Sequence, residues 1–269
     1  MHKIKYDYHI HTTCSFDCQT DINAVAEQAI KLGLTEIAIT DHVEHSYPQR
    51  TSIFSLGVEQ NTQAILNAKE KYKDKLTILI GMEFGLRPDL VDIAQQIADQ
   101  YPFDFIIGST HDIKGTDFSS ASHYTNVPKQ QAYHTYFQNM LDVVTLSNAF
   151  DVVGHLDYVQ RYGTYPDKTL HYKDHSDIID TILTTLIKKD KGIEVNTSGY
   201  RYNGDAPSPS PHIIKRYKEL GGTIITLGSD AHFAEHLAHN FDLALDIIKD
   251  AGFTHITRFK NRKPYFEKI

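Results

Sequence analysis

Short apolar runs alternate with amphipathic helical patterns along the whole sequence, and this alternation constrains the fold more than any other feature. The apolar runs have the length of buried strands, and the segments between them have helical spacing. Such alternation is typical of parallel strands with covering helices. The sequence therefore predicts seven βα units. The expected strands are Lys5–Ile10, Glu36–Thr40, Thr77–Ile80, Phe105–Ile107, Asp151–Val153, Gly192–Val195 and Thr223–Leu227. The expected helices are Ile22–Leu32, Val58–Tyr72, Asp89–Gln100, Lys129–Phe150, Asp174–Lys189, Pro211–Leu220 and Glu235–Asp250, with a last short strand at His255–Thr257.

Both an open doubly wound sheet and a closed barrel satisfy this alternation. The glycine-rich nucleotide-binding fingerprints are absent from the sequence, which disfavours a nucleotide-binding open sheet. A parallel barrel typically takes about 250 residues in one domain, and this chain has 269. Because no linker or composition shift divides the sequence, we expect residues 1–269 to form a single domain.

Composition excludes several classes of function. Hydrophobic residues make up 41% and charged residues 23%, as in an ordinary globular protein with a large core. The net charge of −7 argues against a general nucleic-acid binder. We see no export signal and no apolar run long enough to span a bilayer, so we expect a cytoplasmic protein without a membrane partner. Cys14 and Cys18 are expected to be reduced thiols.

Potential metal ligands follow every expected strand. The sequence contains 16 histidines, and the active site of a parallel barrel lies at the carboxyl ends of its strands. Taken singly, each of these residues would more often be structural. Gathering so many ionisable groups in one cleft is costly unless a metal pairs them, which favours a metal cluster. In chain order the residues are His9 and His11, Asp41 and His42, Glu83, His111, His155, Glu194 and Asn196, and Asp230 and His232.

Spacing and residue type refine the metal hypothesis. His9 and His11 would lie on the same face of a strand, where both rings can chelate one ion. Asp230 and His232 repeat this spacing, although the two side chains can also reach different ions. Glu83 can bridge two ions through its two oxygens. Mixed histidine and carboxylate sets suit Zn, Fe or Mn better than Mg or Ca.

The motifs that contain these residues resemble the signature of the PHP (polymerase and histidinol phosphatase) superfamily over essentially the whole chain. Segments 109–118 and 194–201 further resemble its monofunctional histidinol-phosphatase branch. The resemblance implies a distorted (β/α)7 barrel that hydrolyses L-histidinol phosphate to L-histidinol and phosphate in histidine biosynthesis. The superfamily motifs are Tyr8-His9-Ile10-His11-Thr12, Thr40-Asp41-His42, Gly81-Met82-Glu83, Ser109-Thr110-His111, Gly154-His155-Leu156-Asp157 and Gly228-Ser229-Asp230-Ala231-His232.

The resemblance also implies three divalent metal ions, which are Zn, Fe or Mn. The third ion takes a ligand from the loop after the first strand, and many family members have a histidine there. No histidine follows His11 in this loop, so Asp17 is the candidate. The implied sets are His9, His11, Glu83 and Asp230 for one ion, Glu83, His111 and His155 for a second, and His42, His232 and Asp17 for the third.

The expected chemistry is attack on the phosphate by a hydroxide held between metal ions, because metal binding lowers the pKa of water to about 7. Glu83, Asp230 and His232 are expected at the reacting group as well as on the ions. Arg161 and Arg201 follow the fifth and sixth strands. They are candidates for clamping the phosphate, because a guanidinium group matches phosphate oxygens bidentately.

Two other functions stay open from the sequence. One is a phosphoesterase of the same fold that acts on phosphotyrosine or a nucleotide. The other is a non-catalytic, metal-stabilised accessory domain, against which the intact ligand set argues. For a histidinol phosphate substrate, the candidates for contacting the imidazole and amine are Glu44, His45 and Asp157. The oligomeric state cannot be read from the sequence.

Overall fold

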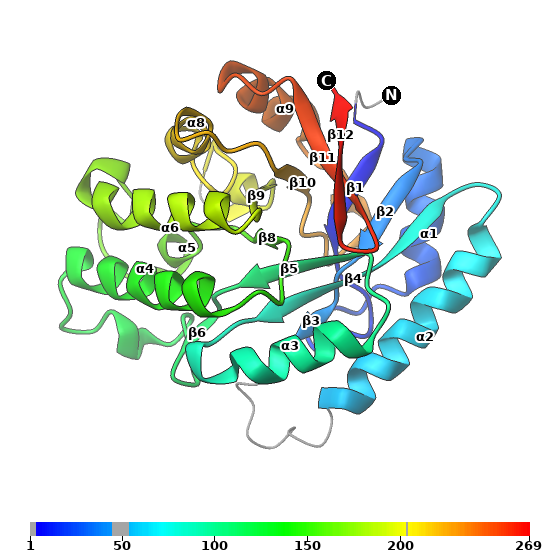
Figure 1. Ribbon diagram of the computed structural model, residues 1–269, viewed down its shortest axis with the longest axis horizontal. Coiled ribbons are helices and arrows are strands. Elements are labelled where there is room, and N and C mark those ends of the chain that lie inside the picture. Colours follow the sequence, from blue (N-terminus) through cyan, green and yellow to red (C-terminus); the bar gives the residue numbers. More distant parts are fainter. Residues whose placement is uncertain (1–3, 45–53, 203) are drawn as a thin grey trace.

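Seven parallel strands form a nearly closed barrel (Figure 1). The computed structural model describes residues 4–44, 54–202 and 204–269. The barrel closes where its last strand returns to its first: the amide of His11 donates to the carbonyl of Ala231 at 2.9 Å, beside a parallel bridge between Ile10 and Ala231. The predicted (β/α)7 barrel is confirmed. In spatial order the strands are β1 (Tyr6–Ile10), β2 (Glu36–Ile39), β4 (Thr77–Gly85), β5 (Phe105–Ser109), β8 (Val152–Val153), β9 (Gly192–Asn196) and β10 (Ile225–Gly228), and β3 (His42–Val43) pairs with β4.

Helices cover the outside of the barrel (Figure 1). Strands β1, β2, β5, β9 and β10 are buried along their whole length, as expected when parallel strands are covered on both faces. The first helix begins and ends where predicted, because Asp21 accepts a hydrogen bond from the Asn23 amide and Gly33 ends the helix in a left-handed conformation (φ 75°). The covering helices are α1 (Ile22–Leu32), α2 (Phe54–Tyr72), α3 (Val91–Gln100), α4 (Lys129–Leu146), α6 (Ser176–Lys188), α8 (Pro211–Glu219) and α9 (Phe241–Asp250).

Two predicted helices are shorter than expected by at least one helical turn. Helix α4 ends at Leu146 and not at Phe150, because the chain becomes extended at Ser147 and carries Phe150 into the core. The helix predicted from Glu235 is interrupted, because Ala238 and Asn240 have left-handed backbone conformations (φ 53° and 59°). A 3-10 turn over 234–236 precedes α9.

Three loops at the carboxyl end of the barrel contain short elements that the sequence analysis did not predict. A small hairpin of β6 (Asp112–Ile113) and β7 (Thr116–Asp117) follows β5. Helix α5 (Val159–Tyr162) follows β8, and helix α7 (Gly199–Tyr202) follows β9. These elements surround the carboxyl ends of the strands.

An antiparallel hairpin closes the other end of the barrel. It consists of β11 (His255–Lys260), of which the sequence predicted only the first half, and β12 (Lys263–Lys268). Arg258 forms an ion pair at 2.7 Å with Glu36 at the start of β2, and Arg262 forms one at 2.6 Å with Asp151 just before β8. Because the hairpin covers the amino ends of the strands, the carboxyl ends are left for a binding site.

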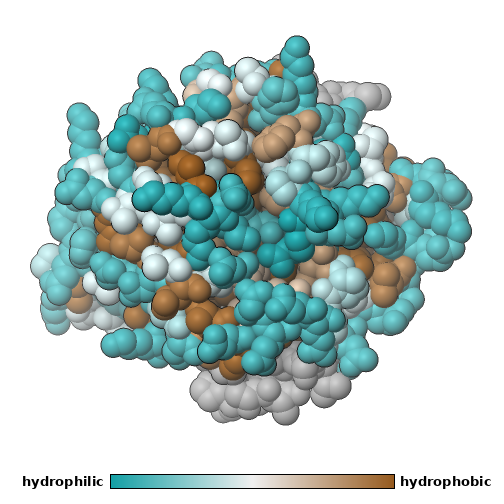
Figure 2. All heavy atoms as spheres, in the orientation of Figure 1, coloured by the Kyte–Doolittle hydropathy of each residue, from teal (hydrophilic) through white to brown (hydrophobic). Residues whose placement is uncertain are grey.

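The face shown in Figure 2 is largely hydrophilic, with smaller apolar groups between the polar side chains. Among the described residues, we find no helix with the length and apolar character needed to cross a bilayer.

Candidate metal centre and active site

Glu83, near the carboxyl end of β4, lies at the centre of a buried cluster of histidines. Its Oε2 atom is 3.3 Å from His9 Nε2 and 3.0 Å from His42 Nδ1. Its Oε1 atom is 2.9 Å from His155 Nε2 and 3.4 Å from His111 Nε2. The side chain is 1% exposed, and Oε2 accepts no hydrogen bond from any described residue. His11 Nε2 is also 3.5 Å from Oε2. One oxygen therefore faces three imidazoles and the other faces two, as expected of a carboxylate that bridges two cations.

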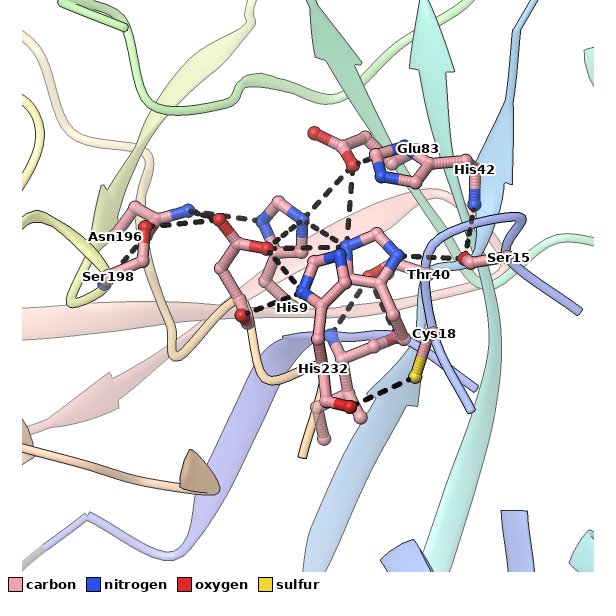
Figure 3. A network of polar contacts seen from close by, with 12 residues as sticks. His9, Ser15, Cys18, Thr40, His42, Glu83, Asn196, Ser198 and His232 are labelled. Carbon is pink, nitrogen blue, oxygen red and sulfur yellow. Dashed lines mark hydrogen bonds and ion pairs between the residues drawn. The ribbon is translucent and has the colours of Figure 1, made fainter. Parts of the chain in front are cut away.

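The rings of His9 and His11 are held so that their Nε2 atoms face each other. Figure 3 shows the labelled side chains of the cluster turned toward one centre; they are His9, His42, His232 and Glu83. His9 Nδ1 is 2.6 Å from Glu194 Oε1, and His11 Nδ1 is 2.9 Å from Ser15 Oγ. Ser15 Oγ accepts from His11, because it already donates to Asp41. When both rings are neutral, these bonds leave two Nε2 lone pairs 3.0 Å apart, and a cation between them removes their repulsion. The residues present thus fit a metal ion.

Asp41 supports this cluster and does not point into it. Its carboxylate accepts hydrogen bonds from the Thr12 amide at 2.5 Å, the Thr12 hydroxyl at 2.8 Å and the Ser15 hydroxyl at 2.8 Å. The sequence analysis placed Asp41 among the potential ligands at the strand ends. The structure instead shows that Asp41 anchors the loop after β1, in which Ser15 orients His11.

Asp17 lies beside the two histidines with which it was predicted to share an ion. Its Oδ2 atom is 3.2 Å from His232 Nε2 and 3.6 Å from His42 Nε2. Nitrogen atoms of His11, His42 and His232 also lie within 4.8 Å of one another. The loop after β1 therefore brings a carboxylate to the place where the resemblance implies a third ligand.

Asp230 is held in an unusual backbone conformation between the histidines. Its φ of 53° is uncommon for a residue other than glycine and is typical of functional sites. Its Oδ1 atom is 3.4 Å from both His11 Nε2 and His232 Nδ1. Its Oδ2 atom accepts a hydrogen bond from the Ser198 hydroxyl at 3.1 Å. The Arg201 guanidinium donates to the Asp230 carbonyl at 2.9 Å and so braces the backbone that presents this carboxylate.

The electrostatics of the cluster keep its carboxylates ionised. Burial opposes ionisation of Glu83, but His9, His42 and His111 hold its pKa well below the ordinary value. Burial, together with the neighbouring His42 and His232, lowers the pKa of His11 to about 3. At neutral pH His11 is therefore an uncharged imidazole, the form that binds metals.

Glu44 orients His111. Its Oε1 atom is 2.5 Å from His111 Nδ1, which leaves the Nε2 lone pair of that ring facing Glu83 and His155. The side chain of Glu44 is only 6% exposed, and a Cβ atom at Gly85 would overlap its carboxylate. Glu44 was predicted to contact the substrate, but its carboxylate is already committed to His111.

The other two residues predicted to contact the imidazole and amine have different outcomes. Asp157 is fully buried, and its carboxylate accepts hydrogen bonds from the Ser208 hydroxyl and, at 2.9 Å, from the Ser210 amide. Burial raises the pKa of Asp157 to about 6. Asp157 therefore anchors the loop before α8 and does not line the cavity described below. His45 lies outside the described residues.

A cavity of about 230 Å³ opens over the cluster. Arg161 lines it and stacks on the ring of Tyr202, with 3.5 Å between the guanidinium carbon and the ring centre. Arg201 is not among the residues that line the cavity, and its Nε and one terminal nitrogen have no hydrogen-bond partner among the described residues. Of the two arginines predicted to clamp the phosphate, Arg161 therefore lines the cavity, and Arg201 contacts the loop that contains Asp230. The lining residues are Asp17, His42, Glu83, His111, His155, Tyr158, Arg161, Tyr162, Tyr202, Asp230, His232 and Phe233.

Sequence reasoning missed several residues that hold the cluster in place. Ser15 orients His11, Ser109 donates to Glu83 Oε1 at 2.6 Å, and Gly228 leaves space for His9 and Glu194. Single serines and glycines carry no signal of such a role. Cys14 and Cys18 are free, as expected, and the Cys18 thiol donates to the His232 carbonyl at 3.1 Å.

Comparison with known proteins identifies the family. The PHP domain family model matches residues 7–198. A histidinol-phosphatase from Lactococcus lactis is 34% identical over 263 residues, which cover 96% of each chain. A solved histidinol phosphate phosphatase from the same organism, in complex with zinc, L-histidinol and phosphate, matches with a TM-score of 0.89 and 33% identity over 97% of this chain and 98% of the other. A solved structure from Listeria monocytogenes shares the fold, with a TM-score of 0.73 and 20% identity over 89% of this chain and 99% of the other. The barrel, the histidine cluster and these matches together show that the chain belongs to the PHP domain family.

Proposed function

We propose that this protein is a histidinol-phosphatase, which hydrolyses L-histidinol phosphate to L-histidinol and phosphate, with residues 1–269 acting as one catalytic domain. The observation that carries the proposal is the position of Glu83 at an open cavity. One of its oxygens faces His9, His11 and His42, and the other faces His111 and His155. The full-length similarity to the Lactococcus lactis histidinol-phosphatase supports the choice of substrate.

We propose that the cluster holds three divalent ions, which are Zn, Fe or Mn. When bound, such ions neutralise phosphate charge and supply hydroxide at neutral pH. His9 and His11 would hold one ion through Nε2, because their Nδ1 atoms are engaged by Glu194 and Ser15. The proposed sets are His9, His11, Glu83 and Asp230; Glu83, His111 and His155; and Asp17, His42 and His232.

Two arginines have different proposed roles: Arg161 contacts the substrate, and Arg201 holds a residue of the metal site. Arg161 reaches the cavity and is oriented by Tyr202, so it is placed to donate hydrogen bonds to phosphate oxygens. Arg201 holds the Asp230 carbonyl, and two of its nitrogens have no hydrogen-bond partner among the described residues, so they remain for a second contact. Glu83, Asp230 and His232 line the same cavity, where we expect them to surround the reacting phosphate.

The test is a comparison of substrates with the purified, metal-supplemented protein. Phosphate release is measured from L-histidinol phosphate, phosphotyrosine and a nucleoside monophosphate, and kcat/KM is compared. The proposal expects the largest kcat/KM for L-histidinol phosphate. A larger kcat/KM for either of the other esters would show that this ester, and not L-histidinol phosphate, is the preferred substrate. Full metal content without turnover of any ester would indicate a non-catalytic domain.

A further inference from the structure

The cavity over the metal cluster continues into a second lobe. This second lobe also has a volume of about 230 Å³. Several residues line both lobes, among them His42, His111 and Tyr158. Its own lining residues are Phe16, Glu44, Asp117 and Ser119. A phosphomonoester bound over the metal cluster by its phosphate can therefore extend its alcohol portion into this second lobe.

The two lobes differ in charge. Arg161 lines the first lobe, where it favours the phosphate. The described residues that line the second lobe include three carboxylates and neither lysine nor arginine. A cationic group on the alcohol portion is favoured in the second lobe for the same electrostatic reason that the phosphate is favoured in the first.

The three carboxylates of the second lobe are not equally available. Asp17 lies against His42 and His232, and Glu44 lies against His111. Asp117 is exposed, and its Oδ1 accepts a hydrogen bond from the Ser119 amide at 2.6 Å. Among the described residues, none forms a hydrogen bond or ion pair with its Oδ2 atom.

The backbone at Asp117 is held in place on both sides. Asp117 lies on β7, paired with Asp112 of β6 in the small hairpin after β5. The next residue, Phe118, is 1% exposed and packs edge-on against Tyr136. The Asp117 carboxylate is therefore carried by an ordered turn at the edge of the cavity.

We propose that Asp117 is a specificity-determining residue that binds an ammonium group on the alcohol portion of the substrate. The proposal rests on the proposed function, because L-histidinol phosphate carries such a group. The half-exposed ring of Phe16, which is stacked on His42 with ring centres 5.3 Å apart, offers a flat apolar surface in the same lobe for an aromatic ring such as imidazole. The chemical class selected is a phosphomonoester of an amino alcohol.

The test uses Asp117→Asn, which removes the charge but keeps an oxygen that can accept from the Ser119 amide. Three esters are compared: L-histidinol phosphate, phosphoethanolamine, which has the ammonium group without the imidazole, and p-nitrophenyl phosphate, which has neither. Loss of one charge-assisted hydrogen bond predicts a fall in kcat/KM of about 10- to 150-fold for the first two esters. The value for p-nitrophenyl phosphate should stay within about twofold, since that ester never makes the charge-assisted bond. Asp142→Asn, at an exposed position on α4, is the matched control and should change none of the three.

Product inhibition gives a second readout. L-histidinol should inhibit the Asp117→Asn variant about 10- to 150-fold more weakly than the wild type, and inorganic phosphate should inhibit both equally. An equal loss for all three esters, or an unchanged kcat/KM for the two ammonium esters, would overturn the assignment. If the wild-type protein hydrolyses phosphoethanolamine but not L-histidinol phosphate, the proposed function fails. The role of Asp117 is then judged on phosphoethanolamine alone.

Discussion

His9 Nε2 and His11 Nε2 lie 3.0 Å apart, and each ring is held in this orientation by a bond at its opposite nitrogen. Glu194 fixes the first ring and Ser15 the second. A pair of lone pairs at this distance is stable only with a positive charge beside it, and two buried carboxylates, Glu83 and Asp230, lie within 4 Å to balance that charge. The polar contacts around these two histidines therefore prepare a cation site before any ion binds.

Asp17 is expected to serve one metal ion only. It contacts His42 and His232 but lies apart from the pair formed by His9 and His11. Asp17→Ala should lower the metal content by about one ion per chain, because the other proposed ligand sets stay complete. Metal analysis of the purified variant by mass spectrometry checks this number. An unchanged content would move the ligand role to another residue of the loop, with Cys14 and Cys18 the next to substitute.

The two arginines should respond differently to substitution. Arg161→Ala should keep the full metal content and lower kcat/KM for L-histidinol phosphate by about 10- to 150-fold, the loss expected for charge-assisted hydrogen bonds. Arg161→Lys should recover only part, because a point charge replaces a planar fork. Arg201→Ala should also lower metal content, since Arg201 braces the Asp230 carbonyl. Full metal content in both variants would show that Asp230 keeps its place without Arg201.

Glu44 is expected to act through His111. Glu44→Gln keeps the shape of the side chain and an acceptor for His111 Nδ1 but removes the charge, so metal affinity should fall by about 10- to 100-fold. Gly85→Ala should have a similar or larger effect, because the added Cβ displaces the Glu44 carboxylate. Gly57→Ala is the matched control, since a Cβ at Gly57 meets no atom of the described residues within 4 Å. Zinc titration monitored by a competing chelator measures the affinity. Equal affinity in all four proteins would contradict the positioning role.

Stability should depend on pH through His175, which lies away from the metal cluster. Burial lowers its pKa below the ordinary value, and its ring packs against Tyr133 and Phe137. The unfolded chain then takes up a proton near pH 6.5 while the folded protein does not, so stability is lost as the pH falls below about 6.5. Thermal melting at pH 7.5 and 5.5 should show a smaller acid-induced drop in Tm for His175→Gln than for the wild type. Equal drops in the two proteins would exclude a contribution from His175.

Sequence reasoning predicted the elements whose ends are determined locally and missed those determined by packing. Helix α1 was predicted to the residue, because Asp21 and Gly33 form its caps. The end of α4 was not predicted, because burial of Phe150 against the rest of the core determines it.

The same distinction holds for the candidate site. Histidines and acids after each strand can be counted in a sequence, since barrel topology gathers them at one end. The partners of Glu44 and Asp41 depend on which loops meet in three dimensions. A carboxylate that binds a metal and one that orients a ligand have the same sequence signal.

The central claim is that Glu83 joins the histidines into a metal-dependent phosphatase centre. The most direct test is kcat/KM of Glu83→Gln for L-histidinol phosphate with excess zinc or manganese, with metal content determined on the same sample. Glu70→Gln, at an exposed position on α2, is the control. The account predicts loss of at least one ion per chain and a fall in kcat/KM of more than about 100-fold, beyond the range seen when only an outer partner of a ligand is lost. A variant with full metal content and a rate near that of the wild type would contradict it.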